Sequence, residues 1–146
     1  MIDLKCQPLR KADFEIWLQM GRKLWPKYGN LRRDFERISK LSYEKVFICW
    51  AGKIPAGFVE VSLRRDYVEG ANSSPTGYLE GIFVEKRFRK NGVARMLVRE
   101  AEAWAKSKGA TELGSDTRLS NRRSQKFHKA LGFIQVEKNV AFIKEL

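Results

Sequence analysis

Residues 77–97, GYLEGIFVEKRFRKNGVARML, are the stretch that most constrains the fold of this chain. They begin with apolar residues typical of a buried strand, continue through a short basic connection, and enter an amphipathic pattern at Val93. The first turn of a helix carries unpaired N–H groups and a partial positive charge, to which phosphate oxygens bind readily. The stretch therefore predicts one of two things: an ordinary strand–loop–helix connection with a solvated loop, or an anion-binding corner.

Apolar periodicity along the rest of the chain predicts an α/β fold. We expect strands at residues 2–7, 46–51, 54–65, 77–84, 111–116, 133–138 and 139–146. We expect helices at residues 13–25, 31–41, 93–108 and 121–131. This β-α-α-β-β-β-α-β-α-β-β order predicts a mixed, partly parallel central sheet with helices on both faces. With 146 residues and no linker composition, we expect a single domain over 1–146.

The formal net charge of +12 suits either a nucleic-acid surface or a pocket for anionic ligands. Short basic clusters at residues 32–33, 86–90 and 122–123 hold much of the excess. Aromatic and basic residues do not alternate as they do in an RNA-binding sheet, and no zinc or recognition-helix motif is present. We therefore expect no nucleic-acid partner. A polyphosphate cofactor accounts for the second and third clusters, and the first is interpreted as a solvated helix face.

The sequence disfavours a membrane protein, a secreted protein and a metal-binding protein. No apolar run approaches the roughly 18 residues of a membrane helix, and residues 1–14 lack the features of a secretion signal. Cys6 and Cys49 lie far apart in the sequence and match no metal or redox spacing. We expect two buried, reduced cysteines in a cytoplasmic protein, with no membrane partner and no metal.

Two motifs support a resemblance to a known family. Residues 89–94, RKNGVA, resemble the Arg/Gln-x-x-Gly-x-Gly/Ala signature of the GNAT superfamily of acetyl-CoA-dependent N-acetyltransferases. Residues 121–133 resemble the second cofactor-side helix of that superfamily, which commonly ends in an aromatic pair and x-x-x-Gly-Phe. The resemblance implies a GNAT-like fold that binds acetyl-CoA.

A closer resemblance, over nearly the whole chain and most specific in 66–84, is to the aminoglycoside 6′-N-acetyltransferases. Its segments are residues 24–26, 66–68, 72–75, 79–84, 115–117 and 124–126. It implies acetyl transfer to an aminoglycoside antibiotic, and hence antibiotic resistance, by direct attack of the amine on acetyl-CoA in a ternary complex. The alternative is a GNAT enzyme for another amine, such as a polyamine, a protein lysine or an N-terminus.

By this resemblance the strand and corner hold the cofactor. The Val84 N–H polarises the thioester carbonyl, Ile82 and Phe83 pair with pantetheine, and the pyrophosphate lies over 90–95, where a side chain at Gly92 would block its approach. The cofactor-binding residues so implied are Ile82, Phe83, Val84, Arg89, Lys90, Asn91, Gly92, Val93, Ala94, Arg95 and Asn121.

Acids near the carboxyl ends of the central strands are candidates for the acceptor site, because carboxylates bind ammonium groups with charge-assisted hydrogen bonds. By resemblance the substrate-binding residues are Trp25, Tyr67, Glu80, Asp116 and Glu137. Simpler roles are a core position for Trp25 and an exposed strand acid for Glu137, and we assign Asp66 and Glu69 no direct role. Glu80 alternates with apolar neighbours, and a buried carboxylate there needs a partner.

The sequence does not decide which groups transfer protons in the reaction. Glu80 or Asp116, acting through water, is the candidate general base, and the alternative is that the pocket selects the neutral amine. Many superfamily members carry a tyrosine as thiolate acid where this chain has His128, which is either catalytic or an ordinary helix residue. The apolar middle of 139–146 and the resemblance favour a homodimer.

Overall fold

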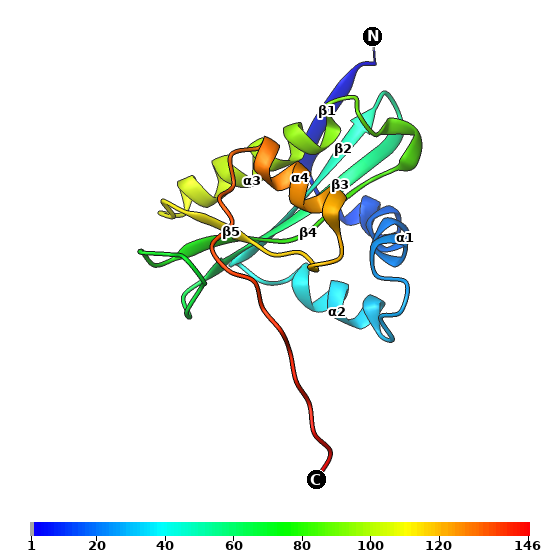
Figure 1. The fold of residues 1–146 in the computed structure, drawn as a ribbon. Coiled ribbons are helices and arrows are strands. Elements are labelled where there is room, and N and C mark those ends of the chain that lie inside the picture. The colour runs from blue at the N-terminus through cyan, green and yellow to red at the C-terminus, as the bar shows by residue number, and fades with distance from the viewer. Residues whose placement is uncertain (1) are drawn as a thin grey trace.

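A computed structural model describes residues 2–146 and is built around a five-stranded sheet of order β1-β2-β3-β4-β5 (Figure 1). The strands are β1 (Leu4–Pro8), β2 (Glu44–Ala51), β3 (Ile54–Arg64), β4 (Thr76–Val84) and β5 (Leu113–Ser115). The first four strands are antiparallel neighbours, and β5 pairs with β4 in parallel. The parallel pair is possible because a helix crosses over between these two strands.

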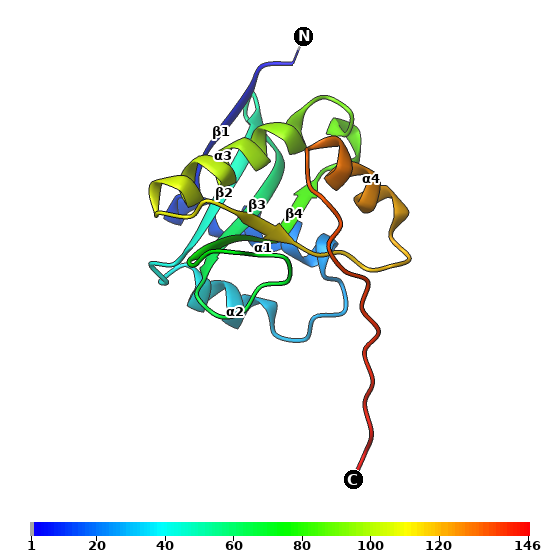
Figure 2. The same cartoon turned by 60° about the vertical axis from the view of Figure 1, so that its left-hand side comes forward.

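Helices cover both faces of the sheet, as the sequence predicts (Figure 2). They are α1 (Phe14–Leu24), α2 (Leu31–Ile38), α3 (Val93–Ser107) and α4 (Arg122–Ala130), with 3-10 turns η1 (Lys11–Asp13) and η2 (Lys86–Phe88). Helices α1 and α2 pack on one face, and α3 and α4 on the other. The mixed α/β architecture is therefore confirmed.

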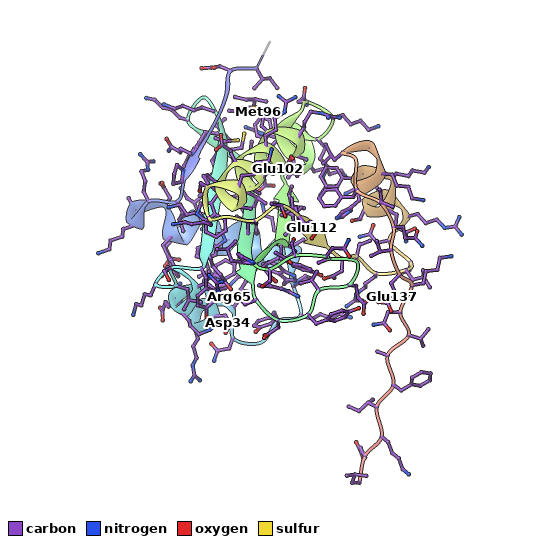
Figure 3. The ribbon with its side chains drawn as sticks, turned by 90° about the vertical axis from the view of Figure 1, so that its left-hand side faces the viewer. Asp34, Arg65, Met96, Glu102, Glu112 and Glu137 are labelled. Atoms are coloured by element: carbon purple, nitrogen blue, oxygen red, sulfur yellow. The ribbon has the colours of Figure 1, made fainter. Side chains whose placement is uncertain are left out.

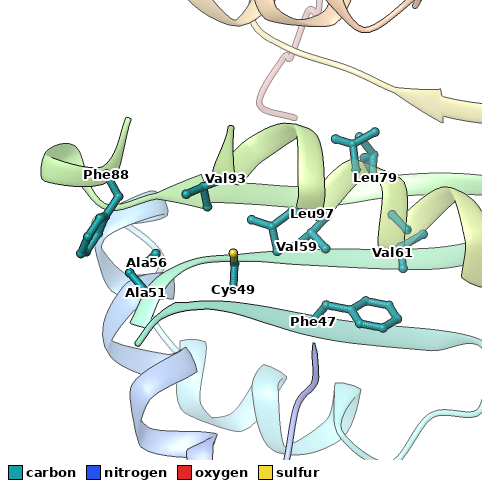
Figure 4. Close-up of a cluster of buried hydrophobic side chains, with 12 residues drawn as sticks. Phe47, Cys49, Ala51, Ala56, Val59, Val61, Leu79, Phe88, Val93 and Leu97 are labelled. Atoms are coloured by element: carbon teal, nitrogen blue, oxygen red, sulfur yellow. The ribbon is translucent and has the colours of Figure 1, made fainter. Parts of the chain in front are cut away.

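The core on the α3 side forms because β3 alternates apolar residues toward that helix. Figure 4 shows Leu97 of α3 beside Val59 of β3, and Val93, Val61 and Leu79 belong to the same cluster. All five side chains are buried. Burial of a large aliphatic side chain stabilises a fold by about 1.5–3 kcal/mol, so this interface fixes the start of α3 against β3 and β4.

The core on the opposite face is aromatic. The rings of Trp17 and Phe35 are stacked with centroids 3.7 Å apart, which joins α1 to α2. Outside this core, Arg32 donates two hydrogen bonds to the Glu15 carboxylate, the shorter at 2.7 Å. Arg32 and Arg33 are both exposed, so the first basic cluster lies on a solvated helix face, from which Arg32 also links the two helices.

The two strands expected at 133–138 and 139–146 are not formed, which corrects the end of the predicted element order. Residues 133–146 have no regular secondary structure, and the last of them extend away from the sheet (Figures 1 and 2). Phe142 is 92% exposed and Ile143 is 99% exposed. A strand needs a neighbouring edge for its backbone N–H and C=O groups, and this segment pairs with no strand among residues 2–146. Alternating apolar residues alone predicted the wrong state.

The two cysteines are neighbours in space despite their separation in sequence. Cys6 of β1 lies directly opposite Cys49 of β2, and both are free thiols. Cys49 is buried as expected, but Cys6 is only half-buried because β1 is an edge strand. Among residues 2–146, every helix is too short or too polar to cross a bilayer.

Candidate active site

The opening between β4 and β5 is the first feature of the site. The two strands are paired only where residues 77–79 meet residues 113–115. Strand β4 continues to Val84, and over residues 80–84 its β5 side has no strand partner within the part of the chain that the structure describes. A free strand edge of this kind pairs readily with an extended, amide-containing ligand. The edge therefore fits a pantetheine arm.

The corner between β4 and α3 is shaped by two residues with positive φ. Lys90 has φ 64° and Gly92 has φ 84°, and Gly92 is the N-cap of α3. Apart from its neighbours in the chain, nothing in residues 2–146 lies within 4 Å of the position that a Cβ on Gly92 would occupy. Glycine is thus suited here by its backbone conformation, not by crowding within the protein.

The first turn of α3 is open to an anion. Gly92 offers no side chain to cap the N–H groups of residues 93–95, which have no partner within the helix. Arg89 lies beside this turn, and its Nε donates to the Val84 carbonyl oxygen at 3.1 Å. Unpaired donors, the helix dipole and nearby basic side chains together fit a pyrophosphate.

The acceptor side is a row of charged and polar groups that joins Glu80 to Asp116. Arg64 of β3 pairs with the Glu80 carboxylate, with Nη2 2.8 Å from Oε2, and its guanidinium lies 3.4 Å from the centre of the Tyr78 ring. The Tyr78 hydroxyl donates to Asp116 Oδ2. Burial and this hydrogen bond raise the pKa of Tyr78, so its hydroxyl remains a donor at neutral pH. The partner that the Glu80 carboxylate needed is therefore Arg64.

The remaining expected substrate residues fall into two places. Trp25, at the end of α1, packs on β4, because a Cβ on Gly81 would come within 2.5 Å of its ring. Tyr67 is 78% exposed and donates to Glu69 at 2.9 Å in the loop before β4. The hydrogen bond to the Glu69 carboxylate raises the pKa of Tyr67, and the charge of Glu137, which approaches this loop from the C-terminal segment, adds to the increase (Figure 3). Trp25 thus lies on the Glu80 strand, whereas Tyr67 and Glu137 form a separate group.

Comparison with known proteins identifies the family. Residues 10–133 match the Acetyltransferase (GNAT) family. The chain belongs to this family.

Full-length relatives narrow the comparison. The chain is 38% identical over 138 residues to the aminoglycoside N(6′)-acetyltransferase type 1 of Salmonella enteritidis, covering 93% of this chain and 95% of that protein. It is 35% identical to the Acinetobacter haemolyticus enzyme of the same name, covering 98% and 99%. The structure of AAC(6′)-Iy in complex with the bisubstrate analogue CoA-S-monomethyl-acetylneamine superposes with a TM-score of 0.93, at 36% identity and 99% coverage of both chains.

His128 of this GNAT chain joins α4 to β5. Its Nδ1 lies 2.7 Å from the Ser124 carbonyl oxygen, which can only accept, so Nδ1 carries the proton. Its Nε2 then accepts from the Ser115 hydroxyl at 2.7 Å. Both ring nitrogens are engaged, so the imidazole holds the two elements together instead of lying free on the helix surface. Asn121 caps α4, its Oδ1 accepting from the Ser124 N–H at 3.0 Å.

An ion pair connects the two halves of the site in this acetyltransferase. Lys23, near the end of α1, lies with Nζ 2.7 Å from Glu85 Oε1. Glu85 directly follows Val84, so the helix that ends at Trp25 is tied to the end of β4.

The residues that sequence reasoning missed lie on the α1–α2 face of the sheet: Glu44, Glu60, Ser62, Arg64 and Tyr78. One signal was available. In β3 the sequence FVEVSLR alternates polar and apolar residues, although helices were expected on both faces of the sheet. Polar residues on a covered strand face indicate a built polar site.

Proposed function

We propose that this GNAT acetyltransferase transfers the acetyl group of acetyl-CoA to the 6′-amine of an aminoglycoside, which inactivates the antibiotic. The observation that carries the proposal is the Glu80–Arg64–Tyr78–Asp116 row beside the opening between β4 and β5. Full-length relatives with this activity in their names, at 35–38% identity, support it.

We assign the cofactor-binding residues from the geometry of the connection between β4 and α3. The first turn of α3 and the basic residues 89–95 would hold the pyrophosphate, and the free edge at residues 82–84 would pair with the pantetheine amides. Bound acetyl-CoA supplies the acetyl group as a thioester. The Val84 N–H is the proposed donor to the developing oxyanion, and the Asn121 amide nitrogen remains available as a further donor.

We assign the acceptor-binding residues from the negative charges beside the opening between β4 and β5. Glu80 and Asp116 provide carboxylates for the ammonium groups of a polycation, in a protein whose overall charge is +12. Trp25 gives an aromatic wall next to Gly81, and we place Tyr67 and Glu137 against the outer rings of the acceptor. This arrangement captures one cationic ligand while the basic corner captures an anionic one.

The chemical step is direct attack of the neutral 6′-amine in a ternary complex. Glu80 or Asp116, through a water molecule, takes the ammonium proton before attack. Cys6 and Cys49 pair across β1 and β2, at the sheet edge far from β5, so an acetyl-cysteine intermediate has no support. We assign His128 a positioning role, because Ser124 and Ser115 engage both of its ring nitrogens.

A thiol-release assay with acetyl-CoA and tobramycin tests the proposal. Asp116→Ala should lower kcat/KM by about 10- to 100-fold, because a hydrogen bond to a charged group contributes roughly 1.5–3 kcal/mol. Asp66→Ala is the matched control, since Asp66 is an exposed loop acid, and it should match the wild type. Absence of thiol release with any aminoglycoside would overturn the proposal.

The competing acceptors are a polyamine and a protein amine. A flat protein acceptor needs no acidic row, whereas a polyamine would also use one. Comparing kcat/KM for kanamycin, spermidine and a lysine peptide separates the three, and we expect kanamycin to be preferred by at least about tenfold, which corresponds to ~1.4 kcal/mol.

We also propose a homodimer that works in the cytoplasm. Residues 139–146 extend from the body and expose Val140, Phe142 and Ile143, which a second copy would cover. The free thiols of Cys6 and Cys49 and the use of acetyl-CoA support a reducing, cytoplasmic location.

A further inference from the structure

Glu60 is a buried carboxylate that the proposed reaction does not yet use. Its side chain, in the middle of β3, is 5% exposed. Within residues 2–146, its Oε2 is fully covered and has no hydrogen-bond partner. A buried carboxylate without a partner is costly, so it is rarely retained without a role or a bound ligand.

Strand register places Glu60 among two other carboxylates. Glu44 of β2 lies opposite Ser62, two residues beyond Glu60 on the same face of β3. Glu80 of β4 reaches this face as well, because its Oε2 accepts from the Ser62 hydroxyl at 3.3 Å. Glu44, like Glu60, has a covered Oε2 without a partner in the part of the chain that the structure describes. Glu44, Glu60 and Glu80 therefore lie on the same face of the sheet, near Ser62.

The cluster also adjoins the acceptor site. Glu60 lies opposite Gly81 of β4, and the Trp25 ring covers Gly81. Glu80 immediately precedes Gly81, so Glu60 is one strand away from the carboxylate to which we assign the acceptor amine. A cation bound at Glu80 would change the electrostatic potential at Glu60 directly.

The positive charges in the vicinity do not balance the cluster. Arg64 pairs with Glu80 alone, while Arg37 of α2 acts on Glu60 from a distance and is itself beside Asp34 of α2. Across residues 2–146, no group of acidic, histidine or cysteine side chains is arranged to hold a metal ion. Because the proposed acceptor is an amino sugar, an organic ammonium is the cation that we expect at this face.

Without a bound acceptor, the cluster of Glu44, Glu60 and Glu80 lowers its negative charge by holding a proton on Glu60. Burial, and then the charges of Glu44 and Glu80, raise the pKa of Glu60 to about 8. At pH 7 a group with that pKa is protonated in roughly nine molecules of ten. An ammonium group nearby favours the ionised form, so the same group ionises when a cation arrives.

Building on the proposed function, we propose that Glu60 holds a proton in the empty enzyme and releases it when a cationic aminoglycoside binds beside Glu80. The acidic face thus gains one negative charge only when the acceptor is present. The step is a simple ionisation, in which the carboxylic acid O–H bond breaks and the proton passes to solvent. Glu60 is accordingly a positioning and specificity residue, since it acts on the acceptor through the field at Glu80.

The test compares tobramycin binding by the wild type and by Glu60→Gln, which keeps the shape and removes the charge. The dissociation constants, measured by calorimetry, should differ by at most about twofold at pH 6 and by about tenfold at pH 8.5, the latter being ~1.4 kcal/mol. Calorimetry at pH 7 in two buffers of different ionisation enthalpy counts the protons released on binding. The wild type should release more protons than Glu60→Gln, by roughly half a proton or more per tobramycin bound.

Glu102→Gln is the matched control, because Glu102 is an exposed residue of α3 on the other face of the sheet (Figure 3). It should behave as the wild type at every pH. A second measurement needs no substitution. In wild-type protein with ¹³C-labelled glutamate, one carboxyl resonance should titrate near pH 8 and move below pH 7 with saturating tobramycin.

The outcomes separate the two proposals. Tobramycin binding with equal proton release by the wild type and Glu60→Gln, or no carboxyl titrating above pH 7, would overturn the role of Glu60 and leave the acetyltransferase proposal intact. Failure of the wild type both to bind and to acetylate tobramycin would overturn the two together.

Discussion

Arg64 is the single side chain on which the charge balance of the acceptor face depends. It is the only cation that contacts Glu80 in residues 2–146, and the Glu80 side chain is 19% exposed. Arg64→Met should lower the free energy of unfolding by about 1–2 kcal/mol, because it leaves a half-buried carboxylate without its charged partner. Urea denaturation at pH 7 measures this. The control is Arg65→Met at the neighbouring exposed position, and equal stabilities of the two variants would contradict the role of Arg64.

Glu60 should also make the stability of the fold depend on pH. Its pKa is raised from an ordinary value near 4.5 to about 8, so between these values the folded state binds more protons than the unfolded state. Its contribution is fully present below about pH 4.5 and is lost as pH rises through 8. Glu60→Gln should therefore gain stability relative to the wild type between pH 5 and pH 8.5, by up to a few kcal/mol at ~1.4 kcal/mol per pKa unit. Thermal unfolding at both pH values tests this, and a constant difference would contradict it.

At the scale of elements, the two ends of α3 offer a matched pair of glycines. Gly92 precedes the helix at φ 84° and Gly109 follows it at φ 92°, and neither is crowded by the rest of the chain. Alanine at either position should cost about 1–2 kcal/mol of stability through backbone strain. Only Gly92→Ala should also raise the KM for acetyl-CoA, by about tenfold, since only that end is the proposed phosphate site. Steady-state kinetics of the two variants decide this, and equal KM values would exclude Gly92 from the cofactor site.

The strand–corner–helix unit was predictable because its signals are local. The patterns predict a strand at 77–84 and a helix from residue 93, and the structure has Thr76–Val84 and Val93–Ser107. The row from Glu80 to Asp116 was not predictable in the same way. It depends on β3 and β4 register, which brings Arg64 opposite Thr76 and lets its guanidinium reach both Tyr78 and Glu80. The strands predicted at 133–146 were wrong for a related reason, since a strand forms only where the edge of a neighbouring strand pairs with it.

At the scale of the whole molecule, the exposed apolar end of the chain sets the expected assembly. Phe142→Ser should weaken the proposed homodimer, because it removes an aromatic side chain that only a second copy would bury. Lys144→Ser, two positions later, is the control and should leave the molecular mass unchanged. Light scattering across a protein dilution series measures both variants. A wild type that is monomeric at every concentration would rule out the dimer.

The ion pair between Lys23 and Glu85 has a consequence for catalysis in solution. It bridges α1, which carries the proposed acceptor residue Trp25 at its end, and the residue after the proposed oxyanion donor, and the Lys23 side chain is 57% exposed. Exposed pairs of this kind weaken as ionic strength rises. Added salt should therefore lower turnover as well as capture of the antibiotic, because it weakens the pair that links α1 to the end of β4, the two elements to which we assign the acceptor and the thioester.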